Sequence, residues 1–359
     1  MTRRYVPLLL TLSALWGASY LFIKVGVRDL APTVLVELRL LLAAAVLVGF
    51  LWLREGGPGA RAALRDAARP GIVLGLVNAS IPFVLIAWGE RHVDSGVAAV
   101  ANGSVPIFNA LIALRFNRDD AVSGARLLGV LAGLVGVAVL AGVNPRGGWW
   151  AVAGTLAVVV ASLSYAASGI YAQKRLSRSA GPALAAAGIV AAAVFTLPFS
   201  LAQLPHHAPG WKSLGSAAAL GIFGTGMAQL VLFRTLRLHG AARTSLVTYL
   251  LPPTALFYGA VFLGEPITAA EAGGLGLILL GVALGSGLVR SNARAAAVEP
   301  GRCASASAAP GPRTSTSSSS SRTTRRSSRT SPAGGRGIER RSRPRSSSRR
   351  ASRTTTDAS

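Results

Sequence analysis

Cysteine is almost absent from this 359-residue chain, and histidine is scarce. The single cysteine, Cys303, excludes an intramolecular disulfide framework and a metal site built on several thiolates. The four histidines lie between apolar runs and do not cluster, so the sequence predicts neither a metal site nor a cofactor. They are His92, His206, His207 and His239.

Acidic residues are also few: there are 13 of them against 37 lysines and arginines, which gives a net charge of +24. Catalysis by paired carboxylates needs two acids within reach of each other. The one acidic doublet, Asp119-Asp120, lies among arginines, and no second acidic cluster accompanies it. An enzyme is therefore not the class that this sequence favours, and no catalytic residue is predicted.

Much of the positive charge lies at the C-terminal end. Residues 290–359 hold 16 arginines and three acidic residues in a background of Ser, Thr, Pro, Ala and Gly. This composition cannot bury enough apolar surface to offset the entropy of ordering, so a disordered tail is expected. We expect this tail to be solvated and to have no dedicated partner. Binding to anionic lipid on the cytoplasmic face is an alternative, and no specific nucleic acid partner is predicted.

Long apolar runs dominate the rest of the sequence. Ten of them have 17 to 24 residues, close to the length that an α-helix needs to cross the hydrocarbon core. The predicted fold class is an all-α integral membrane protein with ten transmembrane helices, surrounded by the lipid bilayer. The predicted spans are 6–27, 33–53, 71–89, 96–114, 127–143, 149–172, 182–201, 214–233, 245–263 and 269–288.

The basic residues between these spans test the topology independently. With the N-terminus in the cytoplasm, the cytoplasmic segments before the tail hold 15 lysines and arginines, whereas the outer segments hold five. Cytoplasmic loops of membrane proteins carry such an excess. We therefore expect a multi-pass protein of the cell membrane (plasma or inner membrane) with both termini in the cytoplasm.

Five of the spans occur twice along the chain. The matching pairs are "SALWGAS" (13–19) with "SLSYAAS" (162–168), "SVPIFNALIAL" (104–114) with "LPPTALFYGAVF" (251–262), and "GVLAGLVGV" (129–137) with "GLGLILLGV" (274–282). A unit with an odd number of crossings makes its second copy enter the membrane from the other side, as in many secondary transporters. The predicted inverted repeats are 1–143 and 149–289.

Prolines fall at corresponding places in the two repeats. Pro252 and Pro253 lie within an apolar and aromatic run, and Pro106 lies in the equivalent span of the first repeat. Each proline frees the carbonyl four residues earlier, which persists in lipid only beside other protein or a water-filled cavity. One interpretation is a cavity near the midplane, where the two breaks approach each other. The other is a pair of kinks that serve only packing.

Further polar residues recur at helical spacing and therefore share one face of each span. Polar faces directed at lipid would be costly, so these faces are expected to point inward, either joining helices or lining a cavity. Amides indicate a cavity more strongly, because each has four hydrogen bonds to satisfy. The predicted substrate-binding residues are Trp16, Tyr20, Asn102, Pro106, Asn109, Ser164, Tyr165, Ser168, Gln229, Thr248, Tyr249 and Pro252.

Charged residues near the outer ends of the first spans are assigned to gating or structure. Lys24 is expected to extend to the interface, as amphipathic side chains do. Glu37 and Arg39 are two residues apart, so they face different directions and need partners on other helices. Glu90 lies at the outer end of the third predicted span. No carboxylate or histidine is placed at mid-membrane depth, which argues against a proton relay.

Glu265 follows the ninth predicted span. It is expected to close that helix and to contact a neighbouring helix end. Thr268 and Glu271, three residues apart, form a capping-box pattern that opens the tenth span.

Glycines mark two further faces. The pairs Gly129/Gly133 and Gly281/Gly285 have the spacing at which small residues let membrane helices approach closely. These spans are repeat equivalents, so a shared packing role is expected, together with a homodimer through the same faces. The run "GIFGTG" (221–226) lacks the Lys-Ser/Thr of a phosphate loop and is also assigned to packing.

Three segments resemble the EamA-type permeases of the drug/metabolite transporter superfamily. "LWGASYLFIKVGVRDLAPTVLVELRLLLAA" (15–44) carries the matching Trp16-Gly17, Lys24, Pro32 and Arg39. The other two are "RHVDSGVAAVANGSVPIFNALIAL" (91–114) and "PPTALFYGAVFLGEPITAAEAGGLGLILLGV" (252–282), in which Glu265 occupies the usual glutamate position.

This resemblance covers residues 5–289. It implies ten helices in two inverted repeats, a central cavity, and movement of small metabolites such as amino acids without ATP. The first repeat departs from the family pattern at "RFNRDDAVS" (115–123), where Asp120 stands in place of the glutamate. Asp120 is therefore not given the role of Glu265.

The function favoured by the sequence is secondary transport of a small-molecule substrate by alternating access. A passive channel or facilitator is the main alternative, and saturable uptake with counter-transport would separate the two. An intramembrane enzyme such as a lipid-modifying transferase is a weaker alternative, because it would need clustered acids, histidines or a metal site.

Cysteine labelling tests the topology. A cysteine introduced by Arg146→Cys should react with an impermeant reagent on intact cells, because that loop is expected outside. A cysteine introduced by Arg61→Cys should react only after permeabilisation. The opposite pattern would overturn the predicted orientation.

Overall fold

The structure is a computed structural model that describes residues 5–116, 124–142, 148–175 and 181–285. Within these ranges all regular structure is helical, which confirms the all-α fold class for the described part of the chain. All described residues belong to one unit, Met1–Ala304. The predicted tail at 290–359, the Asp119-Asp120 doublet and position 146 lie outside the described residues.

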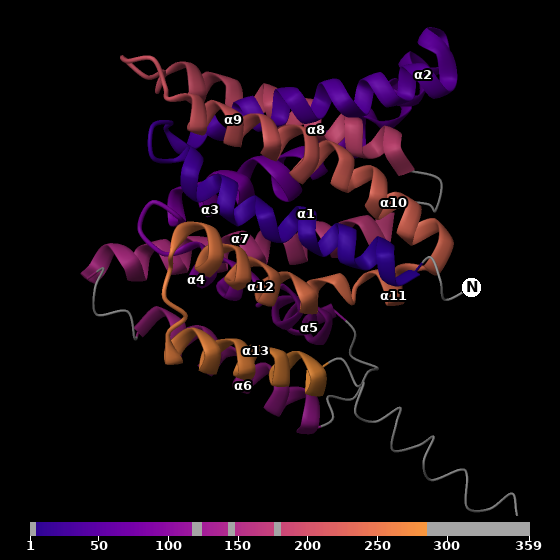
Figure 1. Ribbon diagram of the computed structural model, residues 1–359. Helices are drawn as coiled ribbons and strands as arrows, with labels where there is room; N and C mark the ends of the chain where they lie inside the picture. The colour runs from indigo at the N-terminus through magenta and orange to yellow at the C-terminus, as the bar shows by residue number, and fades with distance from the viewer. Residues whose placement is uncertain (1–4, 117–123, 143–147, 176–180, 286–359) are drawn as a thin grey trace, which may run out of the picture. The chain divides into compact units, whose positions relative to one another are not determined.

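The helical elements follow one another with short connections (Figure 1). Up to residue 142 they are α1 (Tyr5–Gly26), α2 (Pro32–Gly75), η2 (Leu76–Ser80), α3 (Ile81–Gly89), α4 (Ser95–Asn102), α5 (Val105–Phe116) and α6 (Gly124–Gly142). From residue 148 they are α7 (Gly148–Arg175), α8 (Gly181–Leu201), α9 (Trp211–Ala219), η3 (Leu220–Met227), α10 (Ala228–His239), α11 (Ala241–Thr244), α12 (Val247–Tyr258), η4 (Gly259–Leu263) and α13 (Ala269–Gly285). The η elements are π-helical turns that continue neighbouring α-helices.

Helix α2 extends further than the sequence predicts. Residues 54–70 were expected to form a loop, whereas the structure is helical there except for a break at Gly56, where φ is 72° and ψ is 165°. Glycine adopts this conformation without steric cost. After the break, the run "PGARAALRDAARP" is rich in alanine, arginine and leucine, which favour helix, and Pro58 lies in the first turn, where proline is tolerated.

Several helical stretches have the length and composition of membrane spans. Five are long and apolar enough to cross a bilayer, and two further apolar stretches, Val247–Leu263 and Ala269–Gly281, are shorter. The described chain is therefore built largely of apolar helices of membrane-spanning type. The five are Tyr5–Gly26, Pro32–Gly89, Gly148–Ala172, Gly181–Leu201 and Trp211–His239.

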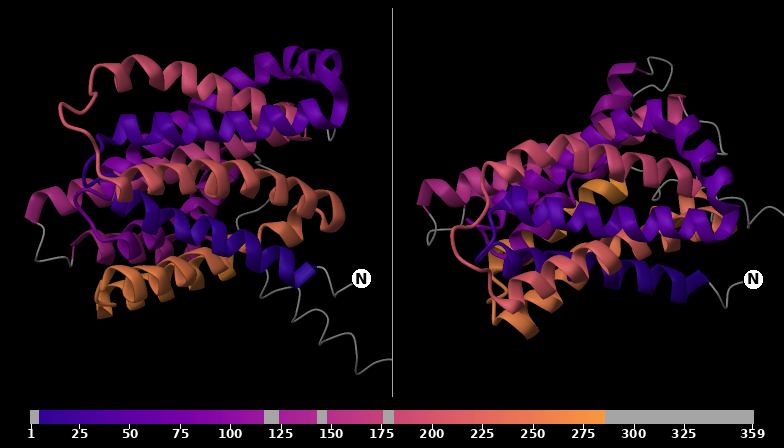
Figure 2. Two further views of the ribbon diagram at one scale, coloured as in Figure 1. Left: turned by 45° about the horizontal axis from the view of Figure 1, so that its top comes forward. Right: turned by 90° about the horizontal axis from the view of Figure 1, so that it is seen from above.

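Helices distant in sequence pack side by side. The most extensively packed pairs are α2 with α8, α6 with α13, α3 with α7, and α1 with α12. Figure 1 shows α6 and α13 together along one edge and α2 and α8 together along the other, and the rotated views of Figure 2 show the same helices from two further sides. The largest cluster of buried apolar residues draws on α1, α2, α3, α4, α7 and α8.

Two of these pairs meet at glycines. A Cβ added to Gly75 in α2 would lie 2.5 Å from the carbonyl oxygen of Gly188 in α8. A Cβ added to Gly281 in α13 would lie 2.5 Å from the carbonyl oxygen of Gly129 and 2.8 Å from the backbone nitrogen of Gly133, both in α6. All three distances are shorter than a Cβ atom can approach, so the backbones come into contact because these residues have no side chain. The expected packing role of these glycine faces is confirmed within the chain, while the homodimer stays a prediction.

The substitution Gly281→Ala tests this packing. Adding one methyl group should push α13 away from α6 and lower the free energy of unfolding by about 1–3 kcal/mol, the usual cost of overpacking. The control is Gly276→Ala in the same helix, because a Cβ there would meet nothing within 4 Å. Thermal unfolding of the two purified variants in detergent measures the difference. Equal unfolding temperatures would show that the close contact is not needed.

Candidate functional site

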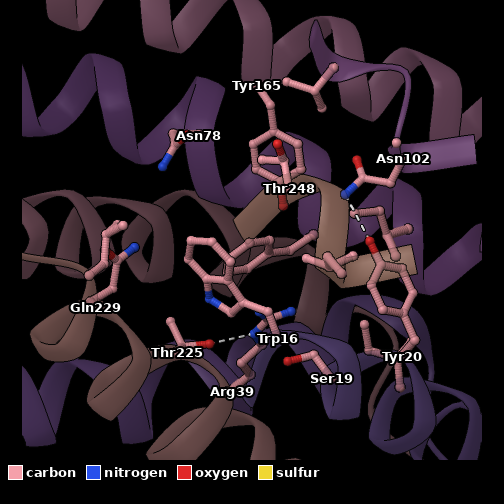
Figure 3. A pocket seen from close by; sticks show the side chains of 18 of the residues that line it. Trp16, Ser19, Tyr20, Arg39, Asn78, Asn102, Tyr165, Thr225, Gln229 and Thr248 are labelled. Carbon is pink, nitrogen blue, oxygen red and sulfur yellow. Dashed lines mark hydrogen bonds between the residues drawn. The ribbon is translucent and has the colours of Figure 1, made fainter. Parts of the chain in front are cut away.

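A cavity of about 280 Å³ lies in the interior of the described structure. Its wall is assembled from α1, α2, α3, α4, α5, α7, α10 and α12, together with η2 and η3. Predicted substrate-binding residues contribute much of this wall, and Figure 3 shows how their side chains converge. The predicted residues that line the cavity are Trp16, Tyr20, Asn102, Pro106, Tyr165, Gln229 and Thr248.

The wall includes an interruption of the helix next to Pro106. Helix α4 ends at Asn102, residues 103–104 form a turn, and α5 begins at Val105. Pro106 has no N–H to donate to the carbonyl of Asn102, so the hydrogen bond that would continue the helix across this point is missing. The prediction of an interruption here is confirmed.

Pro252 and Pro253 do not interrupt their helix, in contrast to the interruption next to Pro106. Helix α12 is continuous through Pro252 and Pro253, and the interruption lies before it, at residues 245–246. There the amides of Thr248 and Tyr249 donate to carbonyls three residues earlier, at 3.1 and 3.2 Å. The structure therefore corrects the position of this break. The two regions nevertheless meet, since a Cβ on Gly103 would lie 3.5 Å from Cγ of Pro252.

Asn102 joins three helices at the edge of the cavity. Its Nδ2 donates to the hydroxyl of Tyr20 in α1 at 2.8 Å, and its Oδ1 accepts from the hydroxyl of Ser162 in α7 at 3.1 Å. Figure 3 shows the Asn102–Tyr20 bond on one side of the cavity and the Gln229 amide on the other, with the Trp16 indole between them in this view. Both expected roles of a buried amide, joining helices and lining a cavity, are combined in Asn102.

Arg39 provides a positive charge in the cavity wall. It is only 7% exposed; its Nε donates to Oγ1 of Thr225 in η3 at 2.7 Å, and its guanidinium carbon lies 3.7 Å from the ring centroid of Phe83 in α3. These contacts fix the guanidinium at the cavity. None of the cavity-lining residues is acidic, so the charge of Arg39 is not neutralised by the wall.

Sequence reasoning assigned Arg39 to gating or structure and did not anticipate its place in the cavity wall. Asn78 in η2 was also missed, although an amide within a predicted apolar span is the same signal that singled out Gln229. Glu37 points elsewhere, as the two-residue spacing from Arg39 predicts. It is 5% exposed, and neither of its carboxyl oxygens has a hydrogen-bond partner.

Five predicted binding residues do not line the cavity. Ser164 donates to the carbonyl of Val77 at 2.6 Å and Ser168 to Oδ1 of Asn78 at 2.7 Å, so these hydroxyls hold α7 against η2. The other three are Asn109, which is exposed, Tyr249, which packs on an apolar cluster, and Pro252, which is buried.

Glu265 binds the start of another helix. Its Oε1 accepts from the amide of Ser95 at 3.1 Å, and its Oε2 accepts from the Ser95 hydroxyl at 2.5 Å and the amide of Gly96 at 3.4 Å. These groups form the N-terminus of α4, where a negative charge is favourable. The expectation that Glu265 contacts a neighbouring helix end is confirmed. The capping box is confirmed as well, since Thr268 and Glu271 exchange hydrogen bonds of 2.7 and 3.2 Å.

Lys24 does not extend to the interface as expected. Its ammonium donates to the backbone carbonyls of Glu90 at 2.9 Å and Val93 at 2.6 Å. Lys24 thereby ties α1 to the turn between α3 and α4. The turn offers unpaired carbonyls because α3 ends there, and these satisfy the ammonium inside the protein.

Metal-binding chemistry has no obvious place in this part of the chain. Among residues 5–116, 124–142, 148–175 and 181–285, no three His, Cys, Asp or Glu side chains come together in a way that could hold a metal ion. The cavity instead offers one guanidinium, several amides and hydroxyls, and aromatic faces.

Several known proteins are similar to this chain over most of its length. An uncharacterized inner membrane transporter of Escherichia coli K12 is 28% identical over 79% of this chain and 91% of its own. A probable terminal-alkyne amino-acid exporter of Streptantibioticus cattleyicolor is 30% identical over 73% of this chain and 87% of its own. A protein of known crystal structure is 22% identical over 79% of this chain and 98% of its own, with a TM-score of 0.57, and shows a similar fold.

The profile of one family matches the chain twice. The EamA-like transporter family matches residues 3–142 and again residues 152–287. Together with the relatives, these matches indicate a multi-pass membrane transporter rather than an enzyme. Because the two matches span well over half of the sequence, the chain belongs to the EamA-like transporter family.

Proposed function

We propose that this protein is a secondary transporter that moves small metabolites such as amino acids by alternating access through the central cavity. The observation that carries the proposal is the cavity wall, in which polar and aromatic side chains from helices far apart in sequence converge. A site shared by many helices changes its access when those helices shift relative to one another.

The proposed architecture has ten transmembrane helices in two inverted repeats, 1–143 and 149–289. The double match of the family profile supports two related halves, and the excess of basic residues in alternate loops supports cytoplasmic termini. The cavity draws on both halves, since Tyr20, Arg39 and Asn102 come from the first, and Tyr165 and Gln229 come from the second. Rocking of one half against the other would expose it alternately to each side.

The substrate class follows from Arg39 and the aromatic walls. A guanidinium with no acidic neighbour in the wall favours a substrate that carries a carboxylate. Trp16, Tyr20 and Tyr165 offer faces for an apolar or aromatic side chain. An amino acid combines these features, and one relative is named as a probable amino-acid exporter. We propose export, from the cytoplasm across the cell membrane, as the direction.

We also propose two partners that do not contact the cavity, a second copy of the chain and anionic lipid. The glycine faces of α6 and α13, through which a homodimer was expected, contact each other within the chain. A homodimer would therefore use other faces of these two helices. The tail at 290–359 would remain solvated or lie on anionic lipid.

The substitution Gln229→Leu tests the assignment of the cavity, and Asn102→Leu is its companion. Removing either amide should lower exchange of a radiolabelled amino-acid mixture by at least about tenfold, or about 1.4 kcal/mol, while membrane insertion is retained. The measurement is counterflow in proteoliposomes, which also separates a transporter from a passive channel. Gln203→Leu is the control, because Gln203 is exposed in the turn that follows α8. Normal exchange by both cavity variants would refute the assignment.

The substitution Arg39→Gln tests the proposed recognition of a carboxylate. It should raise the half-saturating concentration for amino acids by about tenfold or more, because a charge-assisted hydrogen bond is lost. Amino-acid amides, which lack the carboxylate, should be affected much less. The control is Arg69→Gln, since Arg69 is exposed in the second part of α2. An equal loss for acids and amides would show that Arg39 acts only in packing.

A further inference from the structure

Glu90 is a fully enclosed carboxyl group at the end of α3. Its exposed fraction is 0%, and neither side-chain oxygen has a hydrogen-bond partner. Other acids at these helix ends are well bonded: Glu265 accepts from Ser95, and Asp29 accepts from the Ser213 hydroxyl at 2.7 Å. Glu90 therefore lacks the donors that normally accompany a buried carboxylate.

The neighbouring cation is engaged with backbone atoms instead. Lys24 donates to the carbonyl oxygen of Glu90, at 2.9 Å, and to that of Val93, at 2.6 Å, but not to the Glu90 carboxyl group. An ionised carboxylate so close would be expected to attract the ammonium. The arrangement therefore fits a neutral, protonated Glu90.

The charged and titratable groups that face Glu90 from α1 and α2 have partners of their own. From α2, Arg39 is held by Thr225 and lies over the ring of Phe83, and from α1, Tyr20 accepts from Asn102. Helix α7, which packs on α3, has its only charged residues at 174–175, at its far end. Burial raises the pKa of Glu90 well above its usual range. The positive charges of Lys24 and Arg39 lower this pKa, and the negative charge of Glu265 raises it further.

We propose that Glu90 is a proton-binding site through which this transporter couples solute movement to proton movement. The inference rests on the proposed function, but the site itself is defined independently of any solute. Glu90 does not line the cavity; it lies beside Lys24 at the end of α3, where the opening of the outer side would expose it to water.

The coupling follows from the two charge states. When the O–H bond breaks, its electron pair stays on the carboxylate and the proton passes to water on the outer side. The new negative charge then draws the Lys24 ammonium away from the carbonyls of Glu90 and Val93. Since those bonds tie α1 to the turn between α3 and α4, losing the proton loosens this end of the structure. Return of the proton restores them.

The first test needs no solute. The folded protein keeps a proton on Glu90 that the unfolded chain loses above about pH 4.3. Wild-type stability should therefore fall as the pH rises from about 4.3 through the raised pKa of Glu90, and Glu90→Gln should remove part of this fall. Thermal unfolding of the purified full-length protein measures both slopes. Glu55→Gln, which removes an exposed carboxylate in α2, should behave as the wild type.

An equal pH slope for Glu90→Gln and the wild type would overturn the proton site. Failure of Glu90→Gln to insert would also overturn it, because the amide closely resembles the neutral acid in size and shape.

The second test addresses coupling in proteoliposomes with a radiolabelled amino-acid mixture. Glu90→Gln should retain exchange at equal pH within about twofold of the wild type, but accumulation driven by a pH gradient should fall at least tenfold. Glu37→Gln is the matched control, since Glu37 is the other described carboxyl group that is buried without a partner. The coupling would be refuted if the Glu90→Gln variant accumulated amino acids in response to a pH gradient as the wild type does. It would also be refuted if accumulation by the wild type did not depend on the gradient.

The two tests keep the two proposals apart. If the wild type exchanges no amino acid, the proposed function fails and the coupling fails with it. The pH slopes of unfolding would then still decide whether Glu90 binds a proton.

Discussion

Close contact between helix backbones at small residues underlies the rest of this structure. Lipid provides no hydrophobic driving force between apolar helices, so they associate through tight packing and a few polar bonds. Gly221 and Gly224 in η3 show the consequence for the cavity. Added Cβ atoms there would lie 2.8 Å from the carbonyl oxygen of Arg39 and 2.7 Å from the hydroxyl oxygen of Ser19. This proximity of η3 to α1 and α2 lets Thr225 reach Arg39 and fix it at the cavity.

Carboxyl groups at the helix ends divide into two kinds. Glu265 and Asp29 each bind the N-terminus of a helix far away in sequence, α4 and α9, where backbone amides and a hydroxyl satisfy them. Such bonds hold separate segments together. Glu90, at the end of α3, is buried without any donor, and it differs from the equally unpartnered Glu37 inside α2 because it lies at the turn that Lys24 binds. A group that lowers stability and is nevertheless enclosed is a reasonable place to look for function.

The cavity and the Glu90 region are neighbours without being the same site. Arg39 lines the cavity and also opposes the rise in the pKa of Glu90, so its charge acts on both. Tyr20 and Lys24 lie one turn apart on α1, with Tyr20 at the cavity and Lys24 at the turn that contains Glu90. A movement of α1 would therefore shift Tyr20 at the cavity and Lys24 at the Glu90 turn together, which supplies a physical route for the proposed coupling.

The sequence by itself determined the helical class and the capping box at Thr268 and Glu271, because hydropathy and capping patterns are local properties. It did not determine where α2 ends, since the helix continues to Gly75 through a segment that was expected to be a loop. It identified Tyr20, Asn102 and Gln229 at the cavity, since polar groups in apolar helices must face inward. It could not show that Arg39 lines the cavity or that Lys24 binds carbonyls, because both depend on which helices become neighbours. It also placed the second break at Pro252, whereas α12 continues through it. Partners across helices, and the lack of one at Glu90, were decided only by the tertiary structure, because packing alone brings distant segments into contact.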